Sequence, residues 1–151
     1  MLGASPKIEV KDLAGKRIGI VSSQWHLEIC EALVAGAKRA VIEAGINEVT
    51  VRTVAGSFEI PLAAQEMLDD GYDAVVTVGL VLRGETPHFD YVCQGVTSGV
   101  MDVMLSRGKP IGFGVLMCDN LEQAYARSGL PRSKEDKGYD AAIAALDLLR
   151  K

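Results

Sequence analysis

Four short apolar runs alternate with longer stretches of helical period, and this alternation constrains the fold of the 151-residue chain more than any other feature. The runs cover residues 17–22, 48–54, 73–79 and 110–117. They are rich in β-branched residues, which is typical of strands buried on both faces of a parallel sheet. Strands separated by helix-length segments favour an open, doubly wound sheet. We therefore expect a three-layer α/β/α fold of the flavodoxin-like type, with a four-stranded parallel sheet flanked by helices.

The segments between the runs predict helices, because apolar residues recur in them every three to four positions. The expected helices cover residues 24–44, 57–70, 89–107, a short stretch that begins after Asp119 or Asn120 and ends at Gly129, and 137–151. In the first helix the buried stripe is expected to contain Leu27, Cys30, Leu33, Val34, Ala37 and Val41. Gly45 and Gly71 follow two of these segments, as glycine often does where a helix ends.

The chain is expected to form one domain over residues 1–151, with residues 1–14 as an extended N-terminal segment. The triplet IEV at 8–10 can form an additional strand. Because Pro6 precedes it and little local context supports it, this strand is expected to pair with the sheet of a neighbouring subunit.

The composition argues against several classes of function. The net charge is −4 and no basic stripe is present, so nucleic acid and anionic membranes are poor candidates for the main partner. The N-terminus lacks the apolar core of a signal peptide, and the three cysteines are too widely spaced for a disulfide framework. The two histidines lie far apart, which argues against a metal site. We therefore expect a cytoplasmic domain without a metal.

Residues capable of chemistry gather just after the apolar runs. The first run is followed by Trp25, the second by Ser57, Phe58 and Glu59, and the third by a polar cluster that ends in His88. Ligands of an open parallel sheet bind beyond the carboxyl ends of its strands, so these side chains should meet in one crevice. The opposite edge of the sheet offers only Gly, Asp and Lys turns.

Each of these residues also has an ordinary structural explanation. Ser57 can cap a helix, and Glu59 can be an acid that the helix dipole favours in the first turn. Arg127 and Lys137 can be surface residues, or they can supply the positive charge that a phosphate-bearing ligand needs. Neither a dinucleotide fingerprint nor a P-loop is present. The residues alone thus indicate an α/β enzyme for an aromatic-stacked small molecule, with or without a phosphate group.

Five stretches together resemble the 6,7-dimethyl-8-ribityllumazine synthases, the penultimate enzymes of riboflavin biosynthesis. They are AGSFEIPLAAQ (55–65), GLVLRGETPHFDYV (79–92), FGVL (113–116), LEQAYARSG (121–129) and DKG (136–138). RGxTxHxDYV is the most specific of them, and SSQWH with the LPRSKEDKG loop resembles the actinobacterial branch. The resemblance implies a transferase that condenses 5-amino-6-(D-ribitylamino)uracil with 3,4-dihydroxy-2-butanone 4-phosphate. Phosphate and two waters are lost, and no metal or redox cofactor is needed.

The resemblance assigns the ring substrate to residues near three strand ends. Trp25 takes the place that stacks on the heterocycle. The ribityl chain and the pyrimidine are assigned to six further residues, the last three through their backbone: Ser57, Phe58, Glu59, Leu80, Val81 and Leu82. Ser57 stands where many members have Ala, which we expect to be tolerated because the backbone does much of the binding there.

The phosphate-bearing substrate is assigned to a second set. Glu85 and Thr86 with Arg127 occupy the phosphate site, Lys137 contributes from the last helix, and His88 takes the place of the proton-transfer residue. Two residues depart from the family. Glu85 puts a carboxylate beside the phosphate, so its side chain should point away or find a cation. Asp136 replaces the usual Asn and is expected to pair with the neighbouring lysine.

The family's active sites lie between the subunits of a pentamer, so Phe113 is expected to close the site of a neighbouring subunit. The loop at 130–136 is longer than in the members that pack twelve pentamers into 60-subunit icosahedral shells. A pentamer, or a decamer made of two, is therefore favoured. The resemblance also implies a functional link to riboflavin synthase, which consumes the product.

Two alternatives remain open beside this synthase. One is the distantly related archaeal type of riboflavin synthase, against which the complete RGETPHFDYV stretch argues. The other is a non-catalytic carrier of flavin or lumazine that keeps only the stacking pocket. Thr86, His88, Arg127 and Lys137 argue against a carrier, because a carrier has no need of a phosphate site.

Overall fold

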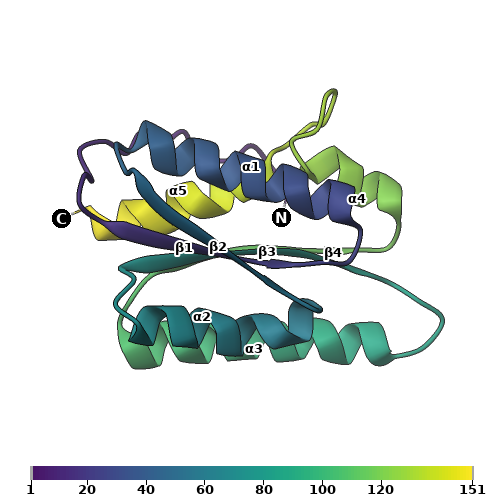
Figure 1. Ribbon diagram of the computed structural model, residues 1–151. Helices are drawn as coiled ribbons and strands as arrows, with labels where there is room; N and C mark the ends of the chain where they lie inside the picture. Colours follow the sequence, from purple (N-terminus) through teal and green to yellow (C-terminus); the bar gives the residue numbers. More distant parts are fainter. Residues whose placement is uncertain (1, 151) are drawn as a thin grey trace.

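The computed structural model describes residues 2–150, which form three layers around a central sheet (Figure 1). The sheet contains β1 (Arg17–Ser23), β2 (Glu48–Val54), β3 (Ala74–Leu82) and β4 (Ile111–Cys118). All neighbouring strands are parallel, and their order is β2-β1-β3-β4. The expected four-stranded parallel sheet is thereby confirmed.

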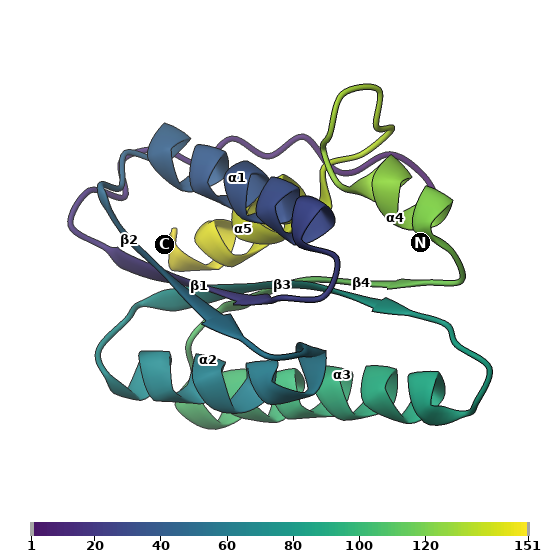
Figure 2. The ribbon, with the colours of Figure 1, turned by 45° about the vertical axis from the view of Figure 1, so that its right-hand side comes forward.

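Helices cover both faces of the sheet, as Figures 1 and 2 show. On one face lie α1 (Leu27–Glu43), α4 (Leu121–Arg127) and α5 (Lys137–Leu149). On the other lie the short 3₁₀ turn η1 (Ser57–Glu59), α2 (Ile60–Asp69) and α3 (His88–Arg107). This arrangement confirms the three-layer α/β/α class. None of the helices in residues 2–150 is long and apolar enough to cross a membrane.

Each helical layer packs on the sheet through its own hydrophobic core. One core joins α1 and α5 to the sheet around Ile18, Leu33 and Leu146, all fully buried. The other joins α2 and α3 to the opposite face around Ile60 and Val96. Burial of this apolar surface is the main force that holds the layers together.

Two details of the burial differ from the expectation. Leu27, predicted to lie on the buried stripe of α1, is 56% exposed because it lies in the first turn, beyond the carboxyl end of β1. β2 is not buried on both faces, since its residues are either exposed or half-buried along its length. Its place at the edge of the sheet explains this difference.

The N-terminal triplet at 8–10 forms no strand in the structure. Val10 is 4% exposed, and Ile8 packs beside it on the core shared by α1 and α5. The segment therefore stays outside the chain's own sheet, as expected. Its pairing with a neighbouring subunit stays a prediction.

The order of the strands places a topological switch between β1 and β3. From β1 the chain moves outward through α1 to the edge strand β2, and from β3 it moves outward through α3 to the opposite edge strand β4. The two connections thus leave in opposite directions and open a crevice at the carboxyl ends of β1 and β3. Ligands of doubly wound sheets bind at this position.

Candidate functional site

The carboxyl end of β3 extends beyond its neighbour β1. The pairing of β1 with β3 ends at Ser22 and Val78, whereas β3 continues beside β4 as far as Leu82. Arg83 N–H donates to the carbonyl of Cys118, at 2.9 Å. Backbone groups alternate sides along a strand, so those of Leu80 and Leu82 face away from β4, toward the crevice past the end of β1. These groups are free to bind a planar ligand with donors and acceptors along its edge.

Val81 differs from its two neighbours in this respect. Val81 lies two residues before Arg83, and backbone groups alternate sides along a strand. Its N–H and C=O therefore point toward β4, as those of Arg83 do. Of the three residues expected to offer backbone contacts, the geometry therefore favours Leu80 and Leu82.

Trp25 lies just after the carboxyl end of β1, with 63% of its surface exposed. Its indole lies against Gly56, where a Cβ atom would be 3.2 Å from Nε1. The thiol of Cys30 donates to the backbone carbonyl of Trp25 at 3.0 Å. Burial raises the pKa of this thiol, which favours the protonated form that can donate. The backbone of Trp25 is thus fixed by Cys30, the indole lies against Gly56, and most of the ring remains open to a ligand.

Ser57 lies at the floor of the crevice and is only 5% exposed. Its Oγ is buried and has no hydrogen-bond partner within residues 2–150. A Cβ atom at Gly79 would be 3.0 Å from this oxygen and 2.6 Å from Oγ of Ser23, so glycine is what lets both hydroxyls approach β3. A buried hydroxyl without a partner costs free energy unless a ligand satisfies it.

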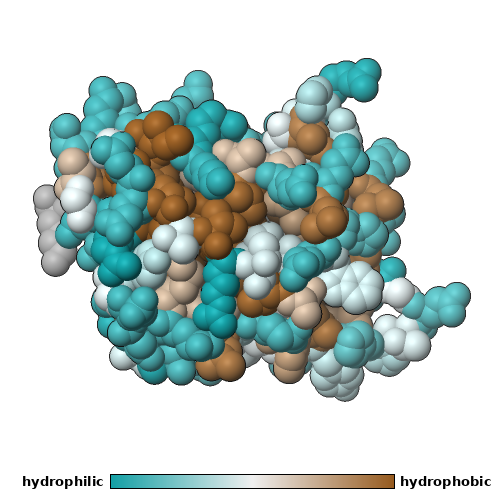
Figure 3. All heavy atoms as spheres, viewed as in Figure 1, coloured by the Kyte–Doolittle hydropathy of each residue, from teal (hydrophilic) through white to brown (hydrophobic). Residues whose placement is uncertain are grey.

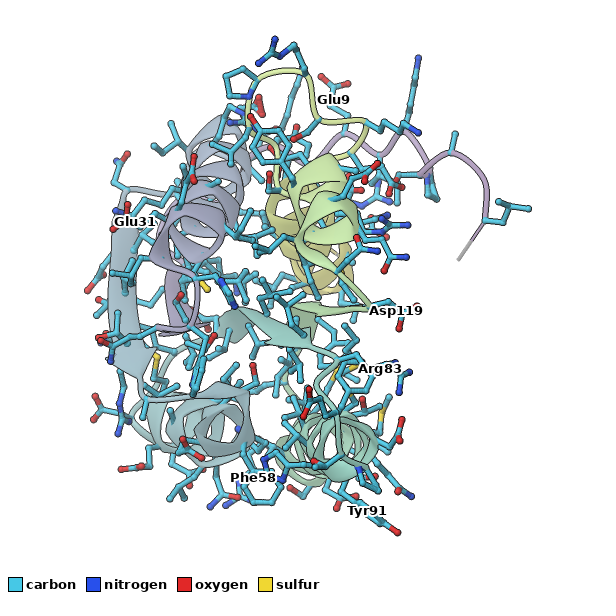
Figure 4. All side chains as sticks on the ribbon, turned by 90° about the vertical axis from the view of Figure 1, so that its right-hand side faces the viewer. Glu9, Glu31, Phe58, Arg83, Tyr91 and Asp119 are labelled. Carbon is cyan, nitrogen blue, oxygen red and sulfur yellow. The ribbon has the colours of Figure 1, made fainter. Side chains whose placement is uncertain are left out.

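The cap of this turn is not Ser57. Gly56 occupies the N-cap, and its N–H donates to the carboxylate of Glu59 at 3.0 Å. The explanation of Ser57 as a simple helix cap is therefore wrong. Glu59 does have a structural role, because its side chain caps the turn by accepting from the N–H of the N-cap residue. Phe58 is 61% exposed and lies against Gly95 of α3, as its position between α2 and α3 in Figure 4 shows.

The loop between β3 and α3 is held by Arg83. Its Nε donates to Asp119 at 2.8 Å, and its Nη1 lies 3.4 Å from Asp90. The guanidinium also stacks on Phe89, 4.3 Å from the ring centre. The hydrogen bond to Asp119 raises the pKa of Arg83 further. Figure 4 looks onto this edge of the sheet and shows Arg83 and Asp119 side by side at the ends of β3 and β4.

This clamp supports the exposed residues that follow it. Thr86 Oγ1 accepts a hydrogen bond from the backbone N–H of His88 at 3.4 Å, which helps to start α3. His88 is the first residue of α3, and its side chain is exposed to solvent. Glu85 is also exposed, and no ion pair of Glu85 is present among residues 2–150. Glu85 therefore has not found a cation within these residues, and whether its side chain points away from the phosphate stays a prediction.

Arg127 and Lys137 form a second cluster, in the layer of α1 and α5. Arg127 Nη1 donates to the carbonyl of Gln123 at 2.9 Å, and its Nε lies 3.8 Å from Glu135. Lys137 Nζ lies 3.1 Å from the same carboxylate and 3.5 Å from Asp140. The two cations are thus brought together by Glu135.

Asp136 does not pair with Lys137, and that expectation is wrong. Its side chain forms an ion pair with Arg39 of α1 and accepts a hydrogen bond from Tyr139 N–H at 3.1 Å. As the N-cap of α5, Asp136 faces back toward its own helix and α1, so it cannot reach the lysine beside it.

The sheet separates the two clusters. His88 begins α3 on one face, whereas Arg127 ends α4 on the other (Figures 1 and 2). Phe113 lies within the edge strand β4, 41% exposed between the buried Ile111 and Val115. One chain therefore places Trp25 and His88 after the carboxyl ends of neighbouring strands, and it brings together Arg127 and Lys137, but His88 and Arg127 belong to different helical layers.

Grooves of the surface lie beside these clusters. One of about 350 Å³ runs between α1 and β2 and is lined by Ser23, Leu27 and Val34 among others. Apolar side chains gather over α1 on this side, as the brown areas of Figure 3 show. A groove of about 900 Å³ between β2 and α2 lies away from the crevice. Within residues 2–150, no three His, Cys, Asp or Glu side chains are placed to hold a metal ion.

The sequence did not reveal four residues that shape the site. Ser23 and Cys30 lie inside a strand and a helix with no local sign of function. Arg83 belongs to the polar cluster after β3, so its presence in the signature was the one available signal. Glu135 lies in a polar loop, and only the fold brings it to Arg127.

Comparison with protein families assigns the chain. Residues 15–151 match the family model of 6,7-dimethyl-8-ribityllumazine synthase. The chain belongs to this family. Similar curated proteins of that name include one from Streptomyces coelicolor, 49% identical over 142 residues that cover 94% of this chain and 88% of the relative. Another, from Kineococcus radiotolerans, is 51% identical over 95% of this chain and 88% of the relative.

A third relative of the same name comes from Pseudarthrobacter chlorophenolicus. It is 55% identical over 130 residues, which cover 86% of this chain and 80% of the relative. Membership of the lumazine synthase family and the similarity to the branch represented by these organisms were both expected from the sequence and are confirmed. The crevice at the switch between β1 and β3 is thus the candidate active site of a lumazine synthase.

Proposed function

We propose that the chain catalyses the reaction of its family, the condensation of 5-amino-6-(D-ribitylamino)uracil with 3,4-dihydroxy-2-butanone 4-phosphate. The product is 6,7-dimethyl-8-ribityllumazine, and phosphate and two waters are released. The observation that carries the proposal is the end of β3, which extends beyond β1 and leaves its backbone groups on that side without a neighbouring strand. The backbone groups of Leu80 and Leu82 extend past the end of β1, away from β4, and the exposed indole of Trp25 follows that same end of β1. A pyrimidine presents both a flat face and a hydrogen-bonding edge, and the crevice offers a partner for each.

The ribityl chain is assigned to the floor of the crevice. Its hydroxyls can satisfy the unpartnered Oγ of Ser57, and Phe58 and Glu59 follow at the start of α2. Glu59 already accepts a hydrogen bond from Gly56 N–H, so one of its carboxylate oxygens is used by the protein. The other oxygen is available to a substrate hydroxyl.

The phosphate of the second substrate is assigned to Thr86 and the amides beside Glu85 from one chain, and to Arg127 and Lys137. An arginine fork and a lysine suit a phosphate dianion, which needs charge and directed donors. His88, at the exposed start of α3, is assigned the proton transfers that accompany loss of phosphate and water. Much of the acceleration should come from proximity, because both reactants are held in reacting geometry.

A second copy of the chain is needed to complete this site. His88 and Arg127 lie on opposite faces of one sheet, so the two sets of residues can meet only when a neighbouring subunit supplies one of them. The exposed apolar side chains of α3 and β4 support such a contact: Tyr91, Met101, Leu105 and Phe113. We propose a homopentamer, alone or paired into a decamer, in which Phe113 closes the neighbour's site.

The cellular setting follows from composition and chemistry. The three cysteines are free thiols, as is usual in the reducing cytoplasm, and this supports a cytoplasmic enzyme. Its lumazine product is the substrate of riboflavin synthase, so a functional link to that enzyme is part of the proposal. Neither a metal nor a redox cofactor enters the proposed reaction.

The test mixes the purified protein with both substrates and follows lumazine absorbance and phosphate release above the uncatalysed rate. Saturable acceleration with equal amounts of lumazine and phosphate is expected. The exposed indole of Trp25 also suits a carrier of flavin or lumazine. Tight binding of either compound without acceleration would reject the synthase and leave the carrier. The mass of the assembly in solution tests the pentamer.

A further inference from the structure

Glu135 lies between the two cations assigned to the phosphate. Its Oε2 is 3.8 Å from Arg127 Nε, and its Oε1 is 3.1 Å from Lys137 Nζ, so each carboxylate oxygen faces one cation. The side chains of Glu135 and Lys137 are only 27% and 30% exposed. Their attraction is therefore screened less by solvent than that of a fully exposed pair.

The backbone holds Glu135 in this position. Its N–H donates to the carbonyl of Ala126 at 3.0 Å, and its carbonyl accepts from Gly129 N–H at 3.0 Å. Ser128 and Asp136 form an antiparallel bridge next to it. The loop after α4 is thus closed back onto the end of that helix. Glu135 can leave the cations only by rotating its side chain.

A second carboxylate completes the charge balance. Asp140 Oδ2 lies 3.5 Å from Lys137 Nζ and accepts a hydrogen bond from Ser5 Oγ at 2.6 Å. The two cations of the cluster are therefore matched by two anions. An incoming phosphate meets a cluster that is already neutral, and the two cations become fully available only when a carboxylate gives way.

We propose that Glu135 competes with phosphate for Arg127 and Lys137 and so sets the affinity of this site. This inference rests on the proposed function and deepens it, because it concerns the same phosphate. The butanone phosphate displaces the Glu135 side chain when it binds. After the reaction, the carboxylate returns to both cations and favours the departure of inorganic phosphate. Glu135 is in this sense a determinant of substrate affinity, and the chemistry does not require it.

The experiment compares the assembled wild-type protein with Glu135→Gln, which removes the charge and keeps the shape. In Glu135→Gln the KM for butanone phosphate and the inhibition constant of inorganic phosphate should both fall, about two- to tenfold, because no anion then competes. The KM for ribitylaminouracil should stay constant, which separates this effect from a general distortion. Glu122→Gln, the same change at an exposed acid in the first turn of α4, is the matched control and should alter none of the three constants.

Two results would overturn the inference. An unchanged inhibition constant in Glu135→Gln means that the carboxylate does not compete. A higher inhibition constant means that Glu135 positions the cations for the phosphate. In either case wild-type catalysis leaves the proposed function intact, whereas failure of the wild-type protein to accelerate the condensation rejects that function itself.

Discussion

The two half-sites of this chain differ in whether their polar groups already have partners before a ligand binds. In the half around β1, β3 and η1, polar groups have no partner among residues 2–150: the backbone at Leu80 and Leu82, and the buried Oγ of Ser57. In the half around α4 and α5, both cations assigned to the phosphate have a partner, since Arg127 and Lys137 share Glu135. Ligand binding in the first half-site can therefore form hydrogen bonds with groups that have none. In the second half-site, the phosphate must replace a carboxylate that already pairs with the cations.

This difference matches the chemistry of the two substrates. A neutral ring gains little from charge, so rigid donors and acceptors on strand ends can select it by position. Two half-buried cations side by side would repel each other, and a carboxylate between them keeps the cluster stable in the absence of ligand. Affinity for the ring is thus set by geometry, whereas affinity for the phosphate is set by competition.

The largest effect is expected from Arg127→Ala. Loss of the guanidinium removes one of the two cations and leaves Glu135 to neutralise the other, so the KM for butanone phosphate should rise roughly a hundredfold. The KM for ribitylaminouracil should change little, because Arg127 belongs to the other half-site. Steady-state kinetics with each substrate varied in turn measures both constants.

A matched control for this variant is Lys134→Ala, an exposed cation in the loop that follows α4. It should leave both constants unchanged, which excludes a general effect of net charge. A KM for ribitylaminouracil that rises as much as the KM for butanone phosphate would break the division into two half-sites.

His88→Ala should have the next largest effect. Removal of a proton-transfer group should lower kcat by about tenfold to a hundredfold, the usual scale for acid–base catalysis. Proximity should supply the remaining acceleration, so activity should persist. His26→Asn is the control, because His26 has φ 55° and Asn tolerates this left-handed conformation. Complete loss of activity in His88→Ala would contradict a reaction driven mainly by proximity.

Most of the fold could be predicted from the sequence, because strands and helices follow local periodicity. All four strands lie where the apolar runs predicted them, and β3 continues three residues further, through Leu80 to Leu82. The exposure of β2 was not predicted, although polar residues alternate with valines along it and such alternation is typical of a half-exposed strand. Only the order of the strands places it at an edge.

The site was predictable to a different extent in its two halves. Residues that follow strand ends are collected by the sheet itself, so Trp25, Ser57 and His88 could be expected near one edge. The absence of a partner for Ser57 Oγ depends on the approach of Gly79 from another strand, which no local pattern records. Likewise, the contact of Arg127 with Glu135 depends on how the loop at 129–136 closes.

Ser57→Ala should have a smaller effect and tests the unmet hydrogen bond directly. Because the buried Oγ has no partner in the part of the chain that the structure describes, its removal should leave the free energy of unfolding unchanged or raise it by up to about 1 kcal/mol. The KM for ribitylaminouracil should rise about two- to fivefold if the hydroxyl binds the ribityl chain. Urea denaturation without substrate measures the first quantity, and kinetics the second. A clear loss of stability would mean that the hydroxyl is satisfied within the folded protein.

The smallest effect is expected from Asp69→Asn, in the layer that carries the first half-site but at the opposite edge of the sheet. Asp69 accepts two hydrogen bonds from Arg107, at 3.1 and 3.2 Å, which joins the ends of α2 and α3. These hydrogen bonds lower the pKa of Asp69. A carboxyl group that is more acidic in the folded state stabilises that state above its unfolded pKa, and the stabilisation is lost as the pH falls through the folded pKa. The urea midpoint of Asp69→Asn should therefore lie slightly below that of wild type at about pH 7, and the difference should vanish in acid.

Both KM values of Asp69→Asn should stay constant, because the crevice is built on strand ends at the other edge of the sheet. If the KM for ribitylaminouracil rises in this variant, the geometry of the first half-site depends on how α2 and α3 are held together, and its rigidity does not come from the strands alone.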